Sequence, residues 1–127
     1  MSLDGKTACH TGDSQWISCE DSREEVHVLR GCYKGIMVGA GTILADNPQL
    51  TARTEGMIDP VRIIVDGHLS VPLKAKVFHE EGENIILTTT ASDEGKRKAL
   101  SDMGVDIIMT DGEENGSVDL EAAMTGL

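Results

Sequence analysis

Three apolar runs from residue 61 onward constrain the fold of this chain more than any other feature. They are 61–65 (VRIIV), 84–90 (NIILTTT) and 105–110 (VDIIMT), and a segment with helical signals separates the last two. Runs so dense in branched apolar residues are typical of strands buried on both faces, as in parallel sheets covered by helices. The alternation of strand and helix therefore predicts an α/β fold, with a mostly parallel sheet flanked by helices.

A fourth strand is expected at the start of the stretch 35–53, GIMVGAGTILADNPQLTAR. Its apolar beginning predicts a buried strand, and Gly39, Gly41 and Thr42 follow as a small-residue loop before a short helical turn over 42–45. Free backbone N–H groups at such a point can bind an anionic ligand. The spacing matches neither the dinucleotide motif GxGxxG nor a Walker loop, so a plain strand-to-helix turn remains an alternative.

A helix is expected between the first loop and this stretch. Residues 1–18 are rich in Gly, Ser, Thr and Asp, which predicts a long ordered loop. The helix then begins at Ser18 or Ser22, and the capping-box sequence SREE favours Ser22. Gly31 or Gly35 is expected to end it.

The remaining elements follow from shorter signals. The segment 75–78 predicts a short strand or turn, and Ser92 is expected to cap a helix that runs through Met103. The segment 119–124 begins a last helix. One domain is predicted, because 127 residues can bury one hydrophobic core but not two ordinary ones.

Charge and composition exclude several classes of function. A net charge of −11 argues against nucleic-acid binding, as does the presence of only one Trp, one Tyr and one Phe. No apolar run is long enough for a membrane span, and no signal peptide follows Met1. Four scattered His residues predict no metal site. Cys9, Cys19 and Cys32 match no disulfide or zinc pattern, so reduced thiols and a cytoplasmic location are expected.

Basic and acidic side chains offer two candidate groups of chemical interest. Arg30 and Arg53, with the Ser14 hydroxyl, could hold one phosphate, although the position of Arg30 on its helix alone favours a surface side chain. Two surface salt bridges would look the same in the sequence. Asp4 and Lys6 form an acid and base pair that could position a carbonyl oxygen or supply a proton, or that could belong to a loop turn.

Two further features would suit a cofactor. Asp66 and Gly67 end a buried strand, at the edge of an open α/β sheet where ligands bind, although a plain turn also explains them. Trp16 could pack on a flat cofactor ring, or it could anchor the loop or core.

Four motifs in order resemble a single family. They are SLDGKTA at 2–8, GDSQWIS at 12–18, the helix REEVHVLR and the stretch VGAGTILADNPQLTAR. Together they resemble the 5-amino-6-(5-phosphoribosylamino)uracil reductase family of riboflavin biosynthesis, whose fold is similar to that of dihydrofolate reductase. PVRIIVDG, LSVP and AKVF extend the resemblance to Phe78, and beyond it only the rhythm of strands and helices agrees.

The resemblance implies a homodimeric enzyme that uses NADPH to reduce the ribosyl group of a phosphorylated aminopyrimidine to the ribityl form. The substrate-binding residues that it implies are Ser14, Arg30, Gln49, Leu50 and Arg53. The NADPH-binding residues are Trp16, Gly39, Gly41, Thr42, Asp46 and Gly67. Lys6 and Asp46 are the catalytic candidates, with Lys6 orienting or protonating the sugar carbonyl oxygen as hydride arrives.

The same resemblance predicts that residues 1–127 are a single, partial reductase domain. Members of the family have an apolar strand before SLDG and, after the last helix, a strand and a Gly-rich loop that holds the cofactor phosphates. Neither occurs in these residues, nor does the zinc deaminase pair of HxE with PCxxC, since no PCxxC is present. Two alternatives remain: a related dihydrofolate-reductase-like enzyme with another pteridine or pyrimidine substrate, and an inactive nucleotide-binding or structural remnant.

Overall fold

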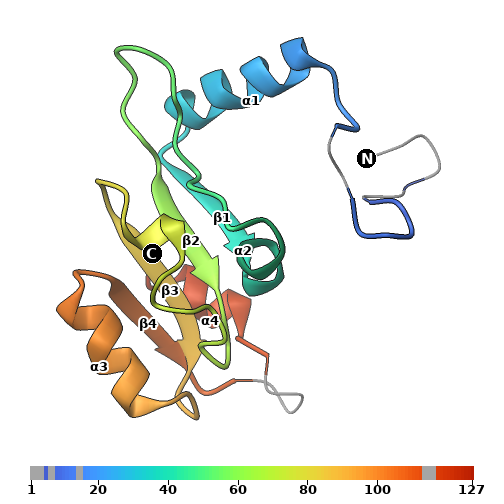
Figure 1. The fold of residues 1–127 in the computed structure, drawn as a ribbon. Helices are drawn as coiled ribbons and strands as arrows, with labels where there is room; N and C mark the ends of the chain where they lie inside the picture. The colour runs from blue at the N-terminus through green and yellow to red at the C-terminus, as the bar shows by residue number, and fades with distance from the viewer. Residues whose placement is uncertain (1–4, 6–7, 14–15, 113–116) are drawn as a thin grey trace.

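One parallel sheet forms the centre of the molecule in the computed structural model (Figure 1). Its strands are β1 (Gly35–Gly39), β2 (Val61–Val65), β3 (Asn84–Thr89) and β4 (Asp106–Thr110), in the spatial order β1-β2-β3-β4. All three pairings are parallel, so the carboxyl ends of the strands meet at one edge of the sheet. The structure describes residues 5, 8–13, 16–112 and 117–127. The predicted α/β fold with a parallel sheet is confirmed.

Helical segments connect and flank these strands. They are α1 (Glu20–Cys32), α2 (Ala40–Asp46), the 3-10 helix η1 (Lys76–Phe78), α3 (Glu94–Asp102) and α4 (Leu120–Met124). The segment 75–78 thus forms a turn of 3-10 helix, which fits the predicted turn and not the predicted strand.

The main hydrophobic core lies on one face of the sheet. Ile64 and Ile86 are 0% and 1% exposed, and they pack with Ile43 of α2 and Leu100 of α3. The other face carries a smaller core in which Leu87 lies against α4. Both faces are therefore covered by helices, but unequally.

β1 is not the buried strand that its apolar sequence predicts. Its residues alternate between exposed and half-buried, because β1 is an edge strand of the described sheet and pairs only with β2 there. The neighbouring helix α1 has no buried residue at all, and its Val26 and Leu29 are 44% and 43% exposed. In Figure 1, α1 extends beyond the end of the sheet and does not cover a face of it.

Three predicted helix starts need correction. α1 begins before Ser22, whose hydroxyl pairs with the Cys19 thiol at 3.2 Å and caps no N–H group. α2 begins at Ala40, so the expected small-residue loop forms the first turn of a helix. Asp93 and not Ser92 caps α3, because the Ser92 hydroxyl donates a hydrogen bond to the carbonyl of Thr89 at 2.7 Å.

The corrected cap of α3 gives a stability prediction. The Asp93 carboxylate accepts a hydrogen bond from the backbone N–H of Lys96 at 2.6 Å, and it also lies at the positive end of the helix dipole. Asp93→Ala is expected to lower the free energy of unfolding by about 1 kcal/mol. Urea denaturation measures the loss. Asp102→Ala, at the other end of α3, is the matched control and should not destabilise the protein, since it removes a negative charge from the negative end of the dipole.

β2 contains a buried charge that the sequence analysis did not single out. Arg62 is 0% exposed, and its Nη2 donates hydrogen bonds to the carbonyls of Glu80 and Glu81 at 3.2 and 2.9 Å. Burial lowers the pKa of Arg62, whereas the charges of Asp59 and Glu80 raise it. A charged side chain in a core strand requires partners of this kind, so Arg62 ties β2 firmly to the turn that precedes β3.

Candidate active site

Two arginines from distant segments contact the same residue, Thr51. Nη1 of Arg30 in α1 donates a hydrogen bond to the Thr51 carbonyl at 3.3 Å. Nε of Arg53 donates to the Thr51 hydroxyl at 3.4 Å. Within the part of the chain that the structure describes, neither guanidinium forms an ion pair with a carboxylate. Two converging guanidinium groups without a counter-ion form an arrangement suited to a phosphate group.

The electrostatics of this arginine pair favour an anion. Burial lowers the pKa of Arg30, and the positive charge of Arg53 lowers it further. Nε of Arg30 is also buried and, among the described residues, has no hydrogen-bond partner. An anion bound beside the pair would stabilise both charges. The half-buried Arg30 is therefore not the snorkelling surface side chain that its helix position favoured.

The backbone of residues 47–53, which include Arg53, has an unusual conformation. Leu50 and Arg53 have φ angles of 61° and 57°, in the left-handed region that non-glycine residues rarely occupy. Leu50 is buried in the main core and fixes the segment from one side. Asp59 fixes it from another, because its carboxylate accepts a hydrogen bond from the N–H of Ala52 at 2.7 Å. Strain of this kind persists only where the surrounding contacts enforce it, and it is common at ligand sites.

A second group of candidate residues lies at the carboxyl ends of β1 and β2. Gly39 and Val65 are aligned in the sheet, so Ala40 and Asp66 leave it side by side. A cavity of about 290 Å³ opens there, and Ala40, Val65 and Gly67 are among its lining residues. Ligands of open α/β sheets bind at this edge.

Two glycines near this edge, Gly39 and Gly41, have free space where a side chain would lie. A Cβ atom placed on Gly39 or Gly41 would meet no other atom within 4 Å, and neither residue has a positive φ. Local packing and backbone geometry therefore do not require glycine at either position. Close approach of a ligand to the backbone would explain both. Thr42 and Asp46 follow at helical spacing, exposed on one side of α2.

The sequence of the whole described fold matches one family model. The match, to the model described as "RibD C-terminal domain", covers residues 1–127. The chain belongs to the RibD C-terminal domain family.

Relatives and solved structures agree with this family. The chain is 38% identical over 123 residues to the riboflavin biosynthesis protein RibD of Chlamydia pneumoniae, covering 94% of this chain and 32% of the relative. It is 43% identical over 108 residues to RibD of Bacillus amyloliquefaciens, covering 84% of this chain and 29% of the relative. The chain thus spans about a third of the length of these two relatives.

Two solved structures share the fold. Acinetobacter baumannii RibD, form 1, aligns with a TM-score of 0.74 at 27% identity, covering 98% of this chain and 34% of that one. A Thermotoga maritima structure titled a diaminohydroxyphosphoribosylaminopyrimidine deaminase/5-amino-6-(5-phosphoribosylamino)uracil reductase aligns with a TM-score of 0.64 at 34% identity, covering 94% and 39%. The resemblance read from the motifs is confirmed.

The residues expected to act in a RibD-type site fall into three groups. Arg30, Gln49 and Arg53 come together, and Leu50 of the same segment is buried in the main core. Gly39, Gly41, Thr42, Asp46 and Gly67 lie at the ends of β1 and β2 or on α2. Lys6 and Ser14 lie outside the described residues, as does Asp4.

Trp16 is not brought to either group. It is 69% exposed, and the guanidinium of Arg23 lies 4.3 Å from the centre of its ring. In Figure 1 the segment before α1 lies beyond that helix, away from the sheet. The structure therefore gives Trp16 a cation–π contact with Arg23 of α1.

The Asp66 carboxylate holds together the turn that follows β2. Its carboxylate is buried and accepts hydrogen bonds from the N–H and hydroxyl of Ser70 and from the N–H of Val71, at 2.8 to 2.9 Å. The neighbouring Gly67 carbonyl accepts the hydroxyl of Thr89 at 2.8 Å. The structure thus shows a hydrogen-bonded turn at Asp66, and this turn fixes the backbone of Gly67 beside the cavity that both residues line.

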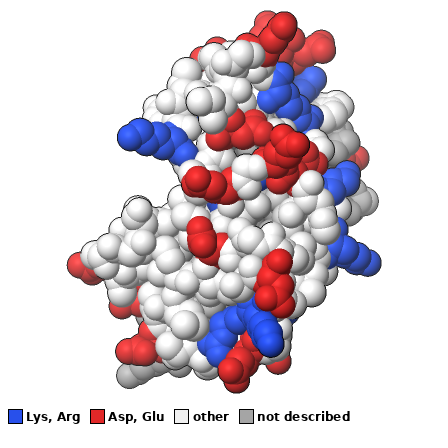
Figure 2. Space-filling view, turned by 90° about the vertical axis from the view of Figure 1, so that its left-hand side faces the viewer, with Lys and Arg blue, Asp and Glu red and all other residues white. Residues whose placement is uncertain are grey.

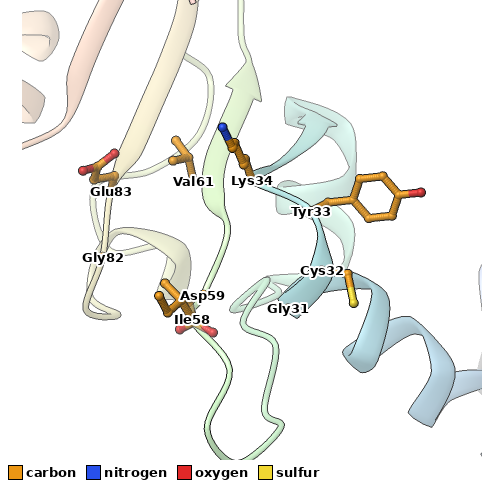
Figure 3. Close-up of a pocket in the computed structure, with 9 residues that line it drawn as sticks. All are labelled: Gly31, Cys32, Tyr33, Lys34, Ile58, Asp59, Val61, Gly82 and Glu83. Carbon is orange, nitrogen blue, oxygen red and sulfur yellow. The ribbon is translucent and has the colours of Figure 1, made fainter.

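A larger cavity, of about 530 Å³, lies at the opposite, amino end of the strands (Figure 3). The end of α1, the segment 58–61 and the turn at Gly82 and Glu83 surround it, and the Tyr33 side chain points away from it. None of the residues expected to bind substrate or cofactor lines this cavity. Its size alone therefore does not make it the site.

On the face drawn in Figure 2, acidic side chains are spread widely and basic ones form small separate groups. None of the described helices is both long and apolar enough to cross a membrane. Across the described ranges, no three His, Cys, Asp or Glu side chains gather in a way that could hold a metal ion.

Proposed function

We propose that this chain carries the reductase activity of riboflavin biosynthesis, reducing the ribosyl side chain of 5-amino-6-(5-phosphoribosylamino)uracil to the ribityl form with NADPH. The observation that supports it most is the arginine pair, Arg30 and Arg53, which has no counter-ion among the described residues. A ribosylamine that ends in a phosphate supplies the missing anion. The names of the relatives point to the same pathway.

The roles of the residues follow from this substrate. Arg30 and Arg53 bind the phosphate, and Gln49 and the Ser14 hydroxyl complete that end of the site. Holding the distant phosphate fixes the sugar in line with the cofactor, which lowers the entropy cost of the reaction. Lys6 donates the proton that the carbonyl oxygen of the open-chain sugar takes up as its carbon is reduced.

NADPH would be held at the carboxyl ends of β1 and β2, and when bound it supplies the hydride. Gly39 and Gly41 leave the backbone open to its phosphates, and Thr42, Asp46 and Gly67 are its other contacts near the cavity of about 290 Å³. Trp16 is the remaining proposed NADPH contact, and in this structure its ring lies against the Arg23 guanidinium.

Substitution of Gly41 is expected to raise the stability of the fold and to weaken NADPH binding. Gly41→Ala is expected to stabilise the folded protein by about 0.5–1 kcal/mol, because Gly41 lies in α2 and its Cβ would have free space. The same methyl group should raise the Kd for NADPH severalfold by blocking the backbone. Urea denaturation and fluorescence titration with NADPH measure the two effects. Unchanged NADPH affinity would remove Gly41 from the cofactor site, whatever the stability.

The function itself is tested by following the oxidation of NADPH by its absorbance. Oxidation that depends on the phosphoribosylamino-uracil supports the proposal. Oxidation that depends only on dihydrofolate would assign the chain to a related pteridine reductase. If the folded protein does not oxidise NADPH in the presence of either compound, the chain is the inactive remnant and the reductase proposal is wrong.

Three further properties complete the proposal: the domain extends beyond these residues, two copies associate, and the protein works in the cytoplasm. The exposed apolar residues of α1 and the unpaired edge of β1 support additional structure on that side. Three free, exposed cysteines suit a reducing compartment. Sedimentation of the protein expressed with its flanking coding sequence tests the association, since a monomer at micromolar concentration would contradict it.

A further inference from the structure

The side chain of Gln49 connects Arg53 to an acidic residue on another segment. The Gln49 amide Nε2 donates a hydrogen bond to Oε1 of Glu80 at 2.5 Å. Its Oε1 accepts a hydrogen bond from Nη2 of Arg53 at 2.7 Å. A carboxylate can only accept and a guanidinium can only donate, so one orientation of the amide satisfies both neighbours. Glu80 therefore decides which end of the Gln49 amide faces Arg53.

The backbone around Glu80 is held in place by contacts with the core and with neighbouring segments. It follows the turn η1, whose Val77 and Phe78 are 0% and 6% exposed and belong to the main core. Its carbonyl accepts a hydrogen bond from the buried Arg62 at 3.2 Å. The segment is also tied to α2, because the side chain of Asn47 accepts a hydrogen bond from the N–H of Lys76 at 2.9 Å.

The contacts thus run in series from the core to the arginine pair. Arg62 holds the backbone at Glu80, the Glu80 carboxylate holds the Gln49 amide, and the Gln49 oxygen holds the Arg53 guanidinium. Arg53 needs such support more than Arg30, because its own side chain is exposed and starts from a left-handed backbone. An exposed arginine without support loses rotamer freedom when it binds a ligand, which weakens binding.

We propose that Glu80 is a positioning residue of the phosphate site, which fixes the Gln49 amide and thereby directs Arg53 toward the anion, while the buried Arg62 holds Glu80 in place. This inference rests on the proposed function, since it takes the phosphate of the substrate as the anion. Glu80 does not touch that anion. Its effect is to make the site favour a phosphorylated sugar over the same sugar without phosphate.

A purely electrostatic role for Glu80 would have the opposite effect. A carboxylate near two arginines repels an anion, so its removal alone would tighten phosphate binding. Removal of a positioning contact loosens phosphate binding. The sign of the change therefore separates the two roles, and Glu80→Gln separates them again, because the glutamine amide keeps an acceptor oxygen for Gln49 but carries no charge.

The test is calorimetric titration of the whole chain with ribose 5-phosphate and, separately, with ribose. Glu80→Ala is expected to weaken the binding of ribose 5-phosphate about tenfold, the loss of roughly one hydrogen bond to a charged group. Glu80→Gln should stay within about twofold of the wild type. Glu81→Ala, which removes the same charge from the exposed neighbouring side chain, is the matched control and should not weaken binding. Thermal unfolding of each variant checks that it is folded.

The outcomes separate this inference from the function on which it rests. If the wild type binds ribose 5-phosphate no better than ribose, both the phosphate site and the role of Glu80 are wrong. If the wild type prefers ribose 5-phosphate and Arg53→Ala abolishes the preference, the phosphate site stands. In that case, Glu80→Ala binding equal to or tighter than the wild type would overturn the positioning role alone. If the Glu80→Ala variant does not fold, the Glu80→Gln variant tests the proposal instead. Binding of ribose 5-phosphate that is about tenfold weaker in Glu80→Gln would also contradict the proposal.

Discussion

Arg53→Ala is expected to raise the KM for the phosphorylated aminopyrimidine about 100-fold while the KM for NADPH stays within about twofold. The substitution removes a guanidinium that forms no ion pair with a carboxylate among the described residues, so it is available to the substrate phosphate. A hydrogen bond to a charged group is worth on the order of 1.5–3 kcal/mol, and a guanidinium can make two of them. Steady-state kinetics with each substrate varied in turn measure both constants.

The matched control for Arg53 is Lys98→Ala, which removes one positive charge from an exposed position on α3. It should change neither KM, because exposed charges farther apart than a Debye length are largely screened. Equal rises in the two KM values of Arg53→Ala would show that the residue supports the fold of the whole site. Such a result would remove Arg53 from the phosphate site.

Ile64→Ala is expected to lower the free energy of unfolding by about 3–4 kcal/mol. Ile64 lies in the middle of β2, is 0% exposed and packs in the main core under α2 and α3. Its truncation loses buried apolar contact and leaves a cavity that the tightly paired strands cannot close. The loss is a large part of the stability of a single domain, and urea denaturation measures it.

Ile58→Ala provides the same substitution at a side chain that is 86% exposed. It should change the free energy of unfolding by less than about 0.5 kcal/mol. If the two substitutions destabilise the protein equally, the assignment of the core to this face of the sheet is wrong.

The sequence predicts the strands well because each is a short, dense run of branched apolar residues between turn signals. It does not predict how deeply a strand is buried, since that depends on its place in the sheet. β2 and β3 are central and hold the core, whereas β1 has a similar apolar sequence but lies at an edge. The predicted helix caps are wrong for a related reason. Ser22 and Ser92 are good capping residues, but each hydroxyl has another partner that the sequence does not reveal.

The sequence likewise predicts some residues of the candidate site and misses others. Arg30, Gln49 and Arg53 follow from the family motif, and the structure brings them together, although their roles remain proposals. Arg62 and Glu80 were missed. The charge of Arg62 inside an apolar run was a usable signal, because a buried arginine requires partners. Glu80 gave no such signal, since it lies 31 residues from Gln49 and only the fold brings the two together.

The central claim is that this chain is a reductase that recognises its substrate by a phosphate group. The most direct test is NADPH oxidation with 5-amino-6-(5-phosphoribosylamino)uracil, compared with the same compound after removal of its phosphate. We predict that kcat/KM falls about 100-fold without the phosphate in the wild type and that this difference nearly disappears in Arg53→Ala. Equal kcat/KM values for the two compounds in the wild type would contradict the claim.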